Sequence, residues 1–249
     1  MQHDDPDQPG RRRFLRRSIY LVPAAAAAST ATVGPALSQA PPPAASAAGA
    51  ASASPAAPYQ PVFLNATEWQ FIQAAVARLI PADDVGPGAV EAGVPEFIDR
   101  QLDGAWGHGA LFYSQGPFHE SSPLFGYQGA LLPRDLYRTV IAATDQWCKQ
   151  QRGGKGFAEL DGAAQDEVLH GLEGGTITFE GSQARDFFAF LLANTKEGYF
   201  ADPIHGGNKK GASWTMIGFP GARADFMDWV QRPGVAYPLP TVTIAGPQG

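Results

Sequence analysis

The sequence predicts a mainly α-helical fold: a single compact helical domain with long ordered loops, after a signal peptide and a disordered Ala/Pro linker. Three observations support this fold class. Beyond residue 63, apolar residues recur at helical spacing, glycine or proline closes the helical segments, and no segment alternates convincingly as a strand would. We therefore divide the 249-residue chain into residues 1–38, 39–62 and 63–249.

The N-terminal segment, residues 1–38, has the pattern of a twin-arginine export signal. Arg11 and Arg12 precede the pair Phe14 and Leu15, and a modestly apolar stretch and small residues follow. This is the order of a cleavable signal peptide. The apolar stretch is too short and too broken by proline to span a membrane. We expect cleavage after Ser38 and delivery of a folded protein to the bacterial periplasm.

A low-complexity linker, residues 39–62, separates the signal from the domain. Residues 40–58 are almost entirely Ala, Pro, Ser and Gly, a composition that cannot bury enough apolar surface to fold. The chain holds 18 basic and 24 acidic residues, of which five and three lie in the signal. The remainder is acidic, which disfavours nucleic acid or anionic lipid as the main partner.

Five helices are expected in the domain. Asn65 can cap the first, with Glu68 completing a capping box, and Pro81 ends it. The second carries a proline in its first turn, and Ser182 can cap the fifth. A long ordered loop, residues 104–133, has no steady period, and loops of this length often carry function. The other helices are expected at 94–102, 133–151, 162–172 and 183–197, with a short helical piece at 225–230.

The sequence contains no recognisable cofactor or catalytic motif. It lacks the dinucleotide fingerprint, the P-loop, the nucleophile elbow and the zinc-protease helix. Glu167 and His170 form a Glu-x-x-His pair, but a di-iron site needs two such pairs. His108, His119 and His205 occupy loop-like segments. A stand-alone periplasmic enzyme with a metal bound by these histidines or by Asp202 is therefore an open alternative.

The most distinctive local segment spans residues 202–208. We interpret Asp202, Pro203, Gly206, Gly207 and Asn208 as a structural loop. Its polar side chains would bond the backbone, and its glycines would adopt unusual turns.

The single cysteine, Cys148, lies in the expected helix 133–151 and excludes an internal disulfide. Helical spacing predicts a buried free thiol. A bridge to a partner subunit is the alternative.

Several blocks of the chain resemble, in order, the small (gamma) subunit of gluconate 2-dehydrogenase, the subunit 3 family. His205 departs from the pattern, because tyrosine is expected there. The blocks that carry the resemblance are AAVARLIPADD (74–84), GPGA (86–89), AGV (92–94), FID (97–99), GPF (116–118), GYQ (126–128), LYR (136–138), FF (187–188), TKEGYFADP (195–203), GGN (206–208) and IGFPG (217–221).

The resemblance implies a non-catalytic subunit without a cofactor of its own. A large FAD-containing subunit would oxidise the sugar acid or polyol. A haem c cytochrome subunit, an indirect partner of this chain, would pass the electrons to the quinone pool of the inner membrane. The small subunit would bind the flavin subunit and support its export by the twin-arginine translocase. An orphan binding protein for another oxidoreductase is the remaining alternative. Because aromatic residues are enriched at interface cores, the candidates for the partner surface are Phe118, Tyr127, Tyr199, Phe200 and Phe219.

Overall fold

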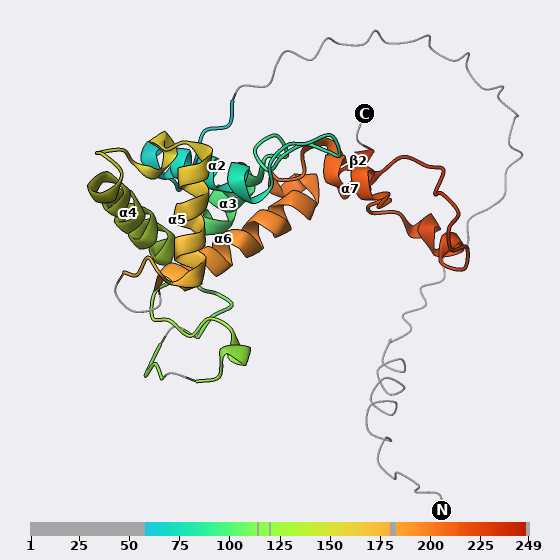
Figure 1. Cartoon of the computed structure of the whole chain (residues 1–249). Coiled ribbons are helices and arrows are strands. Elements are labelled where there is room, and N and C mark those ends of the chain that lie inside the picture. Colours follow the sequence, from blue (N-terminus) through green and yellow to red (C-terminus); the bar gives the residue numbers. More distant parts are fainter. Residues whose placement is uncertain (1–57, 114, 120, 180–182, 248–249) are drawn as a thin grey trace, which may run out of the picture. The chain divides into compact units, whose positions relative to one another are not determined.

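The computed structural model describes residues 58–113, 115–119, 121–179 and 183–247, and it confirms the mainly helical fold (Figure 1). The export signal, nearly all of the linker and the expected cap Ser182 lie outside the described residues.

All five expected helices are present, with bounds close to those predicted. The last of them runs three residues further than expected and ends at Phe200. The helices are α2 (Ala66–Leu79), α3 (Val94–Asp103), α4 (Pro133–Gln151), α5 (Gly162–Gly174) and α6 (Gln183–Phe200). Short 3-10 turns join them: η2 (Pro123–Phe125), η3 (Phe157–Glu159), η4 (Pro203–His205), η5 (Lys209–Gly211) and η6 (Ala224–Trp229).

Side-chain caps explain where two of the helices begin. The predicted capping box is confirmed: Asn65 accepts a hydrogen bond from the Glu68 amide at 3.0 Å, and the Glu68 carboxylate accepts from the Asn65 amide at 2.9 Å. Asp161 caps α5 in a similar way by accepting from the Ala164 amide at 2.9 Å. Each cap satisfies amides that the helix itself leaves unpaired.

Helices α2 and α6 form the centre of the domain. Helix α6 packs against α3, α4 and α5, and α2 contacts all four of the other long helices (Figure 1). The rings of Phe71 in α2 and Phe157 in η3 lie 4.4 Å apart, and those of Tyr137 in α4 and Phe187 in α6 lie 5.1 Å apart. All four are fully buried. Burying one such side chain contributes roughly 1.5–3 kcal/mol. Helical spacing indicates the buried faces of the helices, whereas Phe157 lies in the 3-10 turn η3 and joins the core without that signal.

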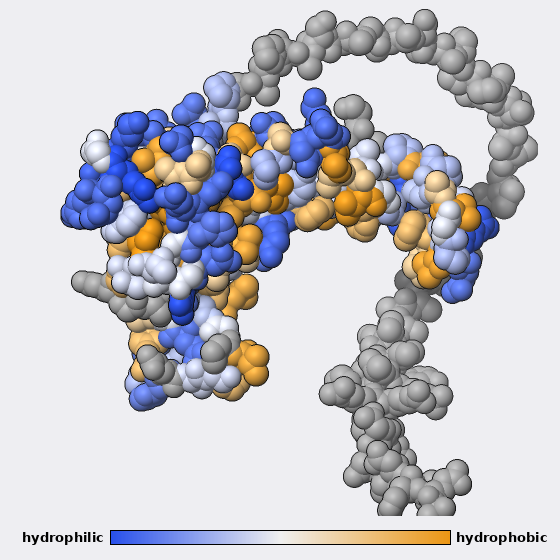
Figure 2. Space-filling model, viewed as in Figure 1, coloured by the Kyte–Doolittle hydropathy of each residue, from blue (hydrophilic) through white to orange (hydrophobic). Residues whose placement is uncertain are grey.

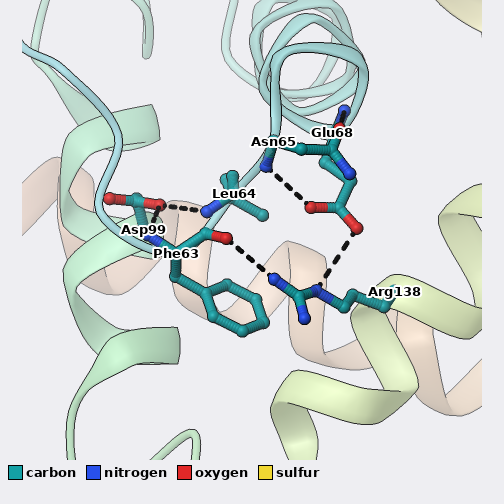
Figure 3. A network of polar contacts seen from close by, with 6 residues as sticks. All are labelled: Phe63, Leu64, Asn65, Glu68, Asp99 and Arg138. Carbon is teal, nitrogen blue, oxygen red and sulfur yellow. Dashed lines mark hydrogen bonds and ion pairs between the residues drawn. The ribbon is translucent and has the colours of Figure 1, made fainter.

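A strap, residues 59–64, is fastened to α3 by the buried carboxylate of Asp99 (Figure 3). Asp99 is fully buried and accepts four hydrogen bonds, from the Tyr59 hydroxyl and from the amides of Val62, Phe63 and Leu64, at 2.7–3.1 Å. Burial, together with the hydrogen bond to Asp99 and its charge, raises the pKa of Tyr59. Packed contacts of the domain thus begin at Tyr59, before the expected boundary at residue 63.

Arg138 ties the same strap to α4 (Figure 3). Its guanidinium donates to the Phe63 carbonyl at 2.9 Å, lies 4.1 Å from the centre of the Phe63 ring and faces Glu68 at 3.5 Å. The capping carboxylate of α2 is therefore shared with a cation from α4. Asp99 and Arg138 together join the start of α2 to two other helices.

The chain after α6 departs from the expected irregular course. A six-residue helix, α7 (Ala212–Ile217), lies between the left-handed glycines Gly211 and Gly218. Strands β1 (Val242–Thr243) and β2 (Gly246–Pro247) pair antiparallel, with Val242 opposite Pro247. The piece expected at 225–230 is a 3-10 turn, η6. In the described part of the chain, no helix has both the length and the apolar character needed to cross a membrane.

Cys148 is free and fully buried in α4, as predicted. Burial, with the nearby charge of Asp145, raises the pKa of the Cys148 thiol from its ordinary value of 9.0 to about 11. The thiol is therefore protonated in the folded protein at neutral pH, and we expect little reactivity from it.

We expect the Asp99→Asn variant to be less stable by about 2–3 kcal/mol. The amide keeps one acceptor oxygen but places an NH2 group against the donors of Tyr59 and Val62. Chemical denaturation of the purified domain measures the loss. Asp103→Asn, at the exposed end of the same helix, is the matched control and should change stability little. Equal effects of the two substitutions would contradict the role given to Asp99.

We expect the Cys148 thiol to react with a thiol reagent at pH 8 at least ~100-fold more slowly in the folded than in the unfolded protein. Two causes act together: the raised pKa lowers the fraction of thiolate, and burial keeps the reagent away from the sulfur. The folded state also keeps its proton at a pH where the unfolded thiol has lost it. Stability should consequently fall as pH rises from 9.0 towards about 11, and a Cys148→Ala variant should lack that component. Rapid labelling of the native protein would refute the assignment.

Candidate partner interface

The root of the long loop, residues 104–132, is an aromatic cluster built on α6. Phe190 stacks against Trp106 at 5.4 Å, Phe112 at 5.6 Å and Tyr127 at 5.0 Å between ring centres. Trp106 also touches the fully buried Tyr137 at 6.4 Å, so the cluster continues the domain core. The root is therefore a partly buried extension of the domain core.

Tyr127 fixes the returning half of this loop. Its hydroxyl donates to the Leu131 carbonyl at 2.7 Å. Burial, followed by the charge of Asp186, raises the pKa of Tyr127 to about 12. A Cβ atom at Gly129 would lie 2.5 Å from the Tyr127 hydroxyl and 2.6 Å from its ring, so only glycine lets the chain pass the ring here. Tyr127 thus supports the loop from within.

The tip of the loop exposes large apolar side chains that this packing leaves out. Figure 2 shows hydrophobic surface over η2, and Leu124 there is 95% exposed. The whole loop contains no Lys or Arg and a single carboxylate, Glu120, which lies outside the described residues. Exposed apolar patches of this kind mark interaction sites. The loop tip comprises Leu111, Tyr113, Phe118, Leu124 and Phe125.

Two hollows adjoin the loop tip. One, of about 500 Å³, lies among the tip residues, and the other, of about 740 Å³, lies between the loop and α6. Both are lined by Phe118, His119 and Tyr127, and Phe190 lines the second. Aromatic walls around a hollow can receive a protruding apolar side chain, which is how interface hot spots pair.

The predicted interface aromatics occupy different environments. Phe118, Phe200 and Phe219 are 40–44% exposed, so their rings are open to a partner. Tyr199 is only 4% exposed, and its hydroxyl donates to the Pro87 carbonyl at 2.7 Å. The interpretation of Tyr199 as a contact residue is therefore corrected, because it packs α6 against the loop that follows α2.

The segment 202–208 is held by its own polar side chains. Asp202 accepts from the Ile204 amide at 3.1 Å and, 42 residues further along the chain, from the Ile244 amide at 2.8 Å. Pro203 is the first residue of η4, and the exposed His205 is its last. The loop therefore also secures the C-terminal hairpin.

Asn208 is fully buried in a left-handed conformation, with φ of 45°. Its amide group donates to the Ala201 carbonyl at 2.9 Å, and its oxygen accepts from both the amide and the hydroxyl of Ser213, at 3.0 and 2.7 Å. A Cβ atom at Gly207 would lie 2.1 Å from the Gly198 carbonyl oxygen. Close backbone approach and buried polar pairing account for this unusual turn.

The other candidate residues have ordinary surface roles in this structure. Glu167 accepts from Arg152 at 2.9 Å, and His170 faces Glu173 at 3.4 Å. The Nδ1 atom of His108 lies 2.9 Å from the Gly104 carbonyl oxygen, and its Nε2 atom contacts Arg134. Among the described residues, no group of three His, Cys, Asp or Glu side chains could hold a metal ion.

Sequence reasoning named the segments around 112–127 and 199–220 as candidate partner surface, but it did not single out the most exposed residues of the loop tip, Leu111, Leu124 and Phe125. The available signal was the absence of basic residues between 104 and 132, because depletion of charge is characteristic of interface cores. Aromatic content alone could not separate the packed Tyr127 from the exposed Phe125. The residues of the export signal, Arg11, Arg12, Phe14 and Leu15, lie outside the described residues.

Comparison with known proteins agrees with the resemblance of the sequence blocks. No curated protein and no solved structure matches the chain. The family model described as gluconate 2-dehydrogenase subunit 3 matches residues 66–221, which include α2 to α7 and the whole long loop. The chain therefore belongs to the gluconate 2-dehydrogenase subunit 3 family.

Proposed function

We propose that this chain is the non-catalytic small subunit of a periplasmic, membrane-associated dehydrogenase, and that it binds the FAD-containing subunit and supports its maturation and export. Membership of a family of dehydrogenase subunits implies partner subunits. FAD and haem c would belong to those partners, with the cytochrome subunit in indirect contact. The substrate class follows from the family as a sugar acid or related polyol.

The exposed loop tip is the observation that carries the binding proposal. Its five apolar side chains stand on a root that is already packed, so little order has to be gained on binding. Pre-organised surfaces lose less conformational entropy when they associate. A contact centred on Leu124, with the aromatic hollows beside it, has the composition of an interface core.

The export proposal rests on the N-terminal pattern. Twin-arginine signals direct folded proteins, and a flavin subunit folds around its cofactor before it leaves the cytoplasm. A signal on the small subunit would then serve both chains. The translocase would recognise the complex by binding Arg11 and Arg12 of this signal.

We expect Leu124→Asp to weaken binding of the FAD-containing subunit at least ~10-fold without changing the unfolding midpoint, because the charge must be buried at the contact. The flavin co-purified with the tagged full chain measures binding. Val85→Asp is the matched control, since Val85 is 73% exposed but lies outside the loop tip. Wild-type chain that retains no flavin subunit, or that oxidises gluconate by itself, would contradict the proposal.

We expect the double substitution Arg11→Lys and Arg12→Lys to abolish dye-linked gluconate oxidation in the periplasmic fraction while the complex still assembles in the cytoplasm. Arg16→Lys with Arg17→Lys is the control, with the same change of side chains outside the pair. Fractionation followed by activity and flavin measurements separates export from assembly. Undiminished periplasmic activity of the first variant would show that the flavin subunit travels without this signal.

A further inference from the structure

Beyond α7 the chain forms a closed arm, residues 222–241, whose base is hydrogen bonded to the domain. The Ala222 amide donates to the Val242 carbonyl at 2.7 Å, and the Val242 amide donates to the Pro220 carbonyl at 3.1 Å. Gly221 permits this approach, because a Cβ atom there would lie 2.0 Å from the Val242 carbonyl oxygen. The arm lies outside the residues 66–221 matched by the family model.

The arm is ordered by contacts within itself. Tyr237 stacks on Phe226 at 5.4 Å and on Trp229 at 5.7 Å, and its hydroxyl donates to Asp225 at 2.8 Å. Arg223 donates to the Pro240 carbonyl at 2.8 Å. None of the residues 222–241 is buried. Figure 2 shows hydrophobic surface over η6, and the exposed apolar side chains of the arm are Phe226, Met227, Val230, Val235 and Leu239.

A pocket of about 550 Å³ lies where the arm meets the end of α7. Phe219, Phe226 and Tyr237 contribute aromatic walls, and Lys210 is the charged side chain among its lining residues. No carboxylate in the described ranges pairs with Lys210, whereas the neighbouring Lys209 pairs with Glu96 at 3.0 Å. The pocket thus combines aromatic walls with a cation that has no ion-pair partner among the described residues.

Lys210 also has a strained backbone. Its φ of 60° lies in the left-handed region, which side chains other than those of Gly, Asn and Asp seldom adopt. Glycine would fit this position better, so the lysine side chain is retained at a cost to stability. Strain of this kind is concentrated at functional sites. It is a second observation, independent of the exposed apolar surface, that points to a ligand at the pocket.

We propose that the arm and its Lys210 pocket form a second docking surface for the FAD-containing subunit, which inserts an apolar side chain beside a carboxylate. This inference rests on the proposed function, which supplies the partner. The arm has no net charge, since Arg223 and Arg232 balance Asp225 and Asp228, so the pocket cation sets the electrostatic preference.

Two other occupants suit this surface less well. The chain's own leader carries five arginines, and Lys210 would repel them. A lipid surface would have to accommodate Asp225 and Asp228, which flank Phe226 and Met227. Charged side chains are costly to bury in such an environment. A partner protein with an acidic, apolar segment meets both requirements.

The decisive variant is Lys210→Gly in the full chain, co-expressed with the FAD-containing subunit. We expect it to raise the unfolding midpoint, because glycine relieves the left-handed strain, and to weaken flavin-subunit binding at least ~10-fold. Lys210→Arg, which keeps the charge, should retain binding. Lys155→Gly is the matched control, because it removes the same charge at another exposed lysine outside the pocket. If Lys210 had only a structural role, Lys210→Gly would change the unfolding midpoint and flavin-subunit binding in the same direction, and that result would contradict the proposal.

Met227→Asp tests the apolar arm in the same assay, and the oligomeric state of each variant is measured by light scattering. Wild-type-like binding by Lys210→Gly and Met227→Asp, with binding still lost in Leu124→Asp, would overturn the second surface and leave the proposed function standing. Failure of the wild-type chain to bind the flavin subunit would overturn both the second docking surface and the proposed function. Self-association that these substitutions abolish would assign the arm to a second copy of this chain and so overturn the inference.

Discussion

The buried carboxylate of Asp99 is the interaction on which the start of the domain depends. A charge with no exposure to water must be fully hydrogen bonded to be tolerated, and Asp99 meets this requirement with three backbone amides and one phenol. Those donors lie in six consecutive residues, so the strap has essentially one way to satisfy them. The position of the strap then fixes the cap of α2 and, through Arg138, its distance from α4. An extended segment without regular secondary structure thereby becomes part of the folded domain, and the linker can vary in length upstream of Tyr59 without disturbing the helices.

The aromatic chain that runs from Phe71 through Phe187 and Tyr137 to Trp106 performs a similar task for the long loop. Each ring is packed on the next, and the last members, Phe190 and Tyr127, belong to the root of the loop. The same chain of rings therefore explains why the root of the loop is packed and why its tip, which lies beyond the last ring, is exposed. The aromatic residues at the root of the loop are covered by the core, whereas Leu124 and Phe125, further out, remain exposed. A shaped apolar tip on a rigid base is suited to binding because most of its order is present before a partner arrives.

Local sequence determined the five long helices, because each carries its own signals: apolar spacing, the Asn65 and Asp161 caps, and prolines at the starts of α3 and α4. The remainder could not be predicted in this way. Helix α7 is too short to show a period and is bounded by glycines that read as loop residues. Tyr199 resembles an exposed aromatic in sequence, and its burial depends on Pro87, 112 positions away. The link between Asp202 and Ile244 spans 42 residues and has no sequence signature. In each case the missing information is a long-range contact, which local patterns do not contain.

The helical body and the two exposed apolar surfaces, the loop tip and the arm, differ in how many charged residues they carry. Ion pairs lie on the helices, as between Arg78 and Asp166 and between Arg152 and Glu167, and they keep those faces hydrated. The long loop has almost no charged residue, and the arm has a balanced set. Because the arm has no net charge and the long loop has almost no charged residue, long-range attraction from these two surfaces is weak. Recognition there depends on shape and on short-range contacts, the cation of Lys210 among them. Short-range contact of this kind is strongest with a partner surface that is already ordered, because less conformational entropy is lost on association. Under the proposed function, that partner is the FAD-containing subunit, folded around its cofactor before export.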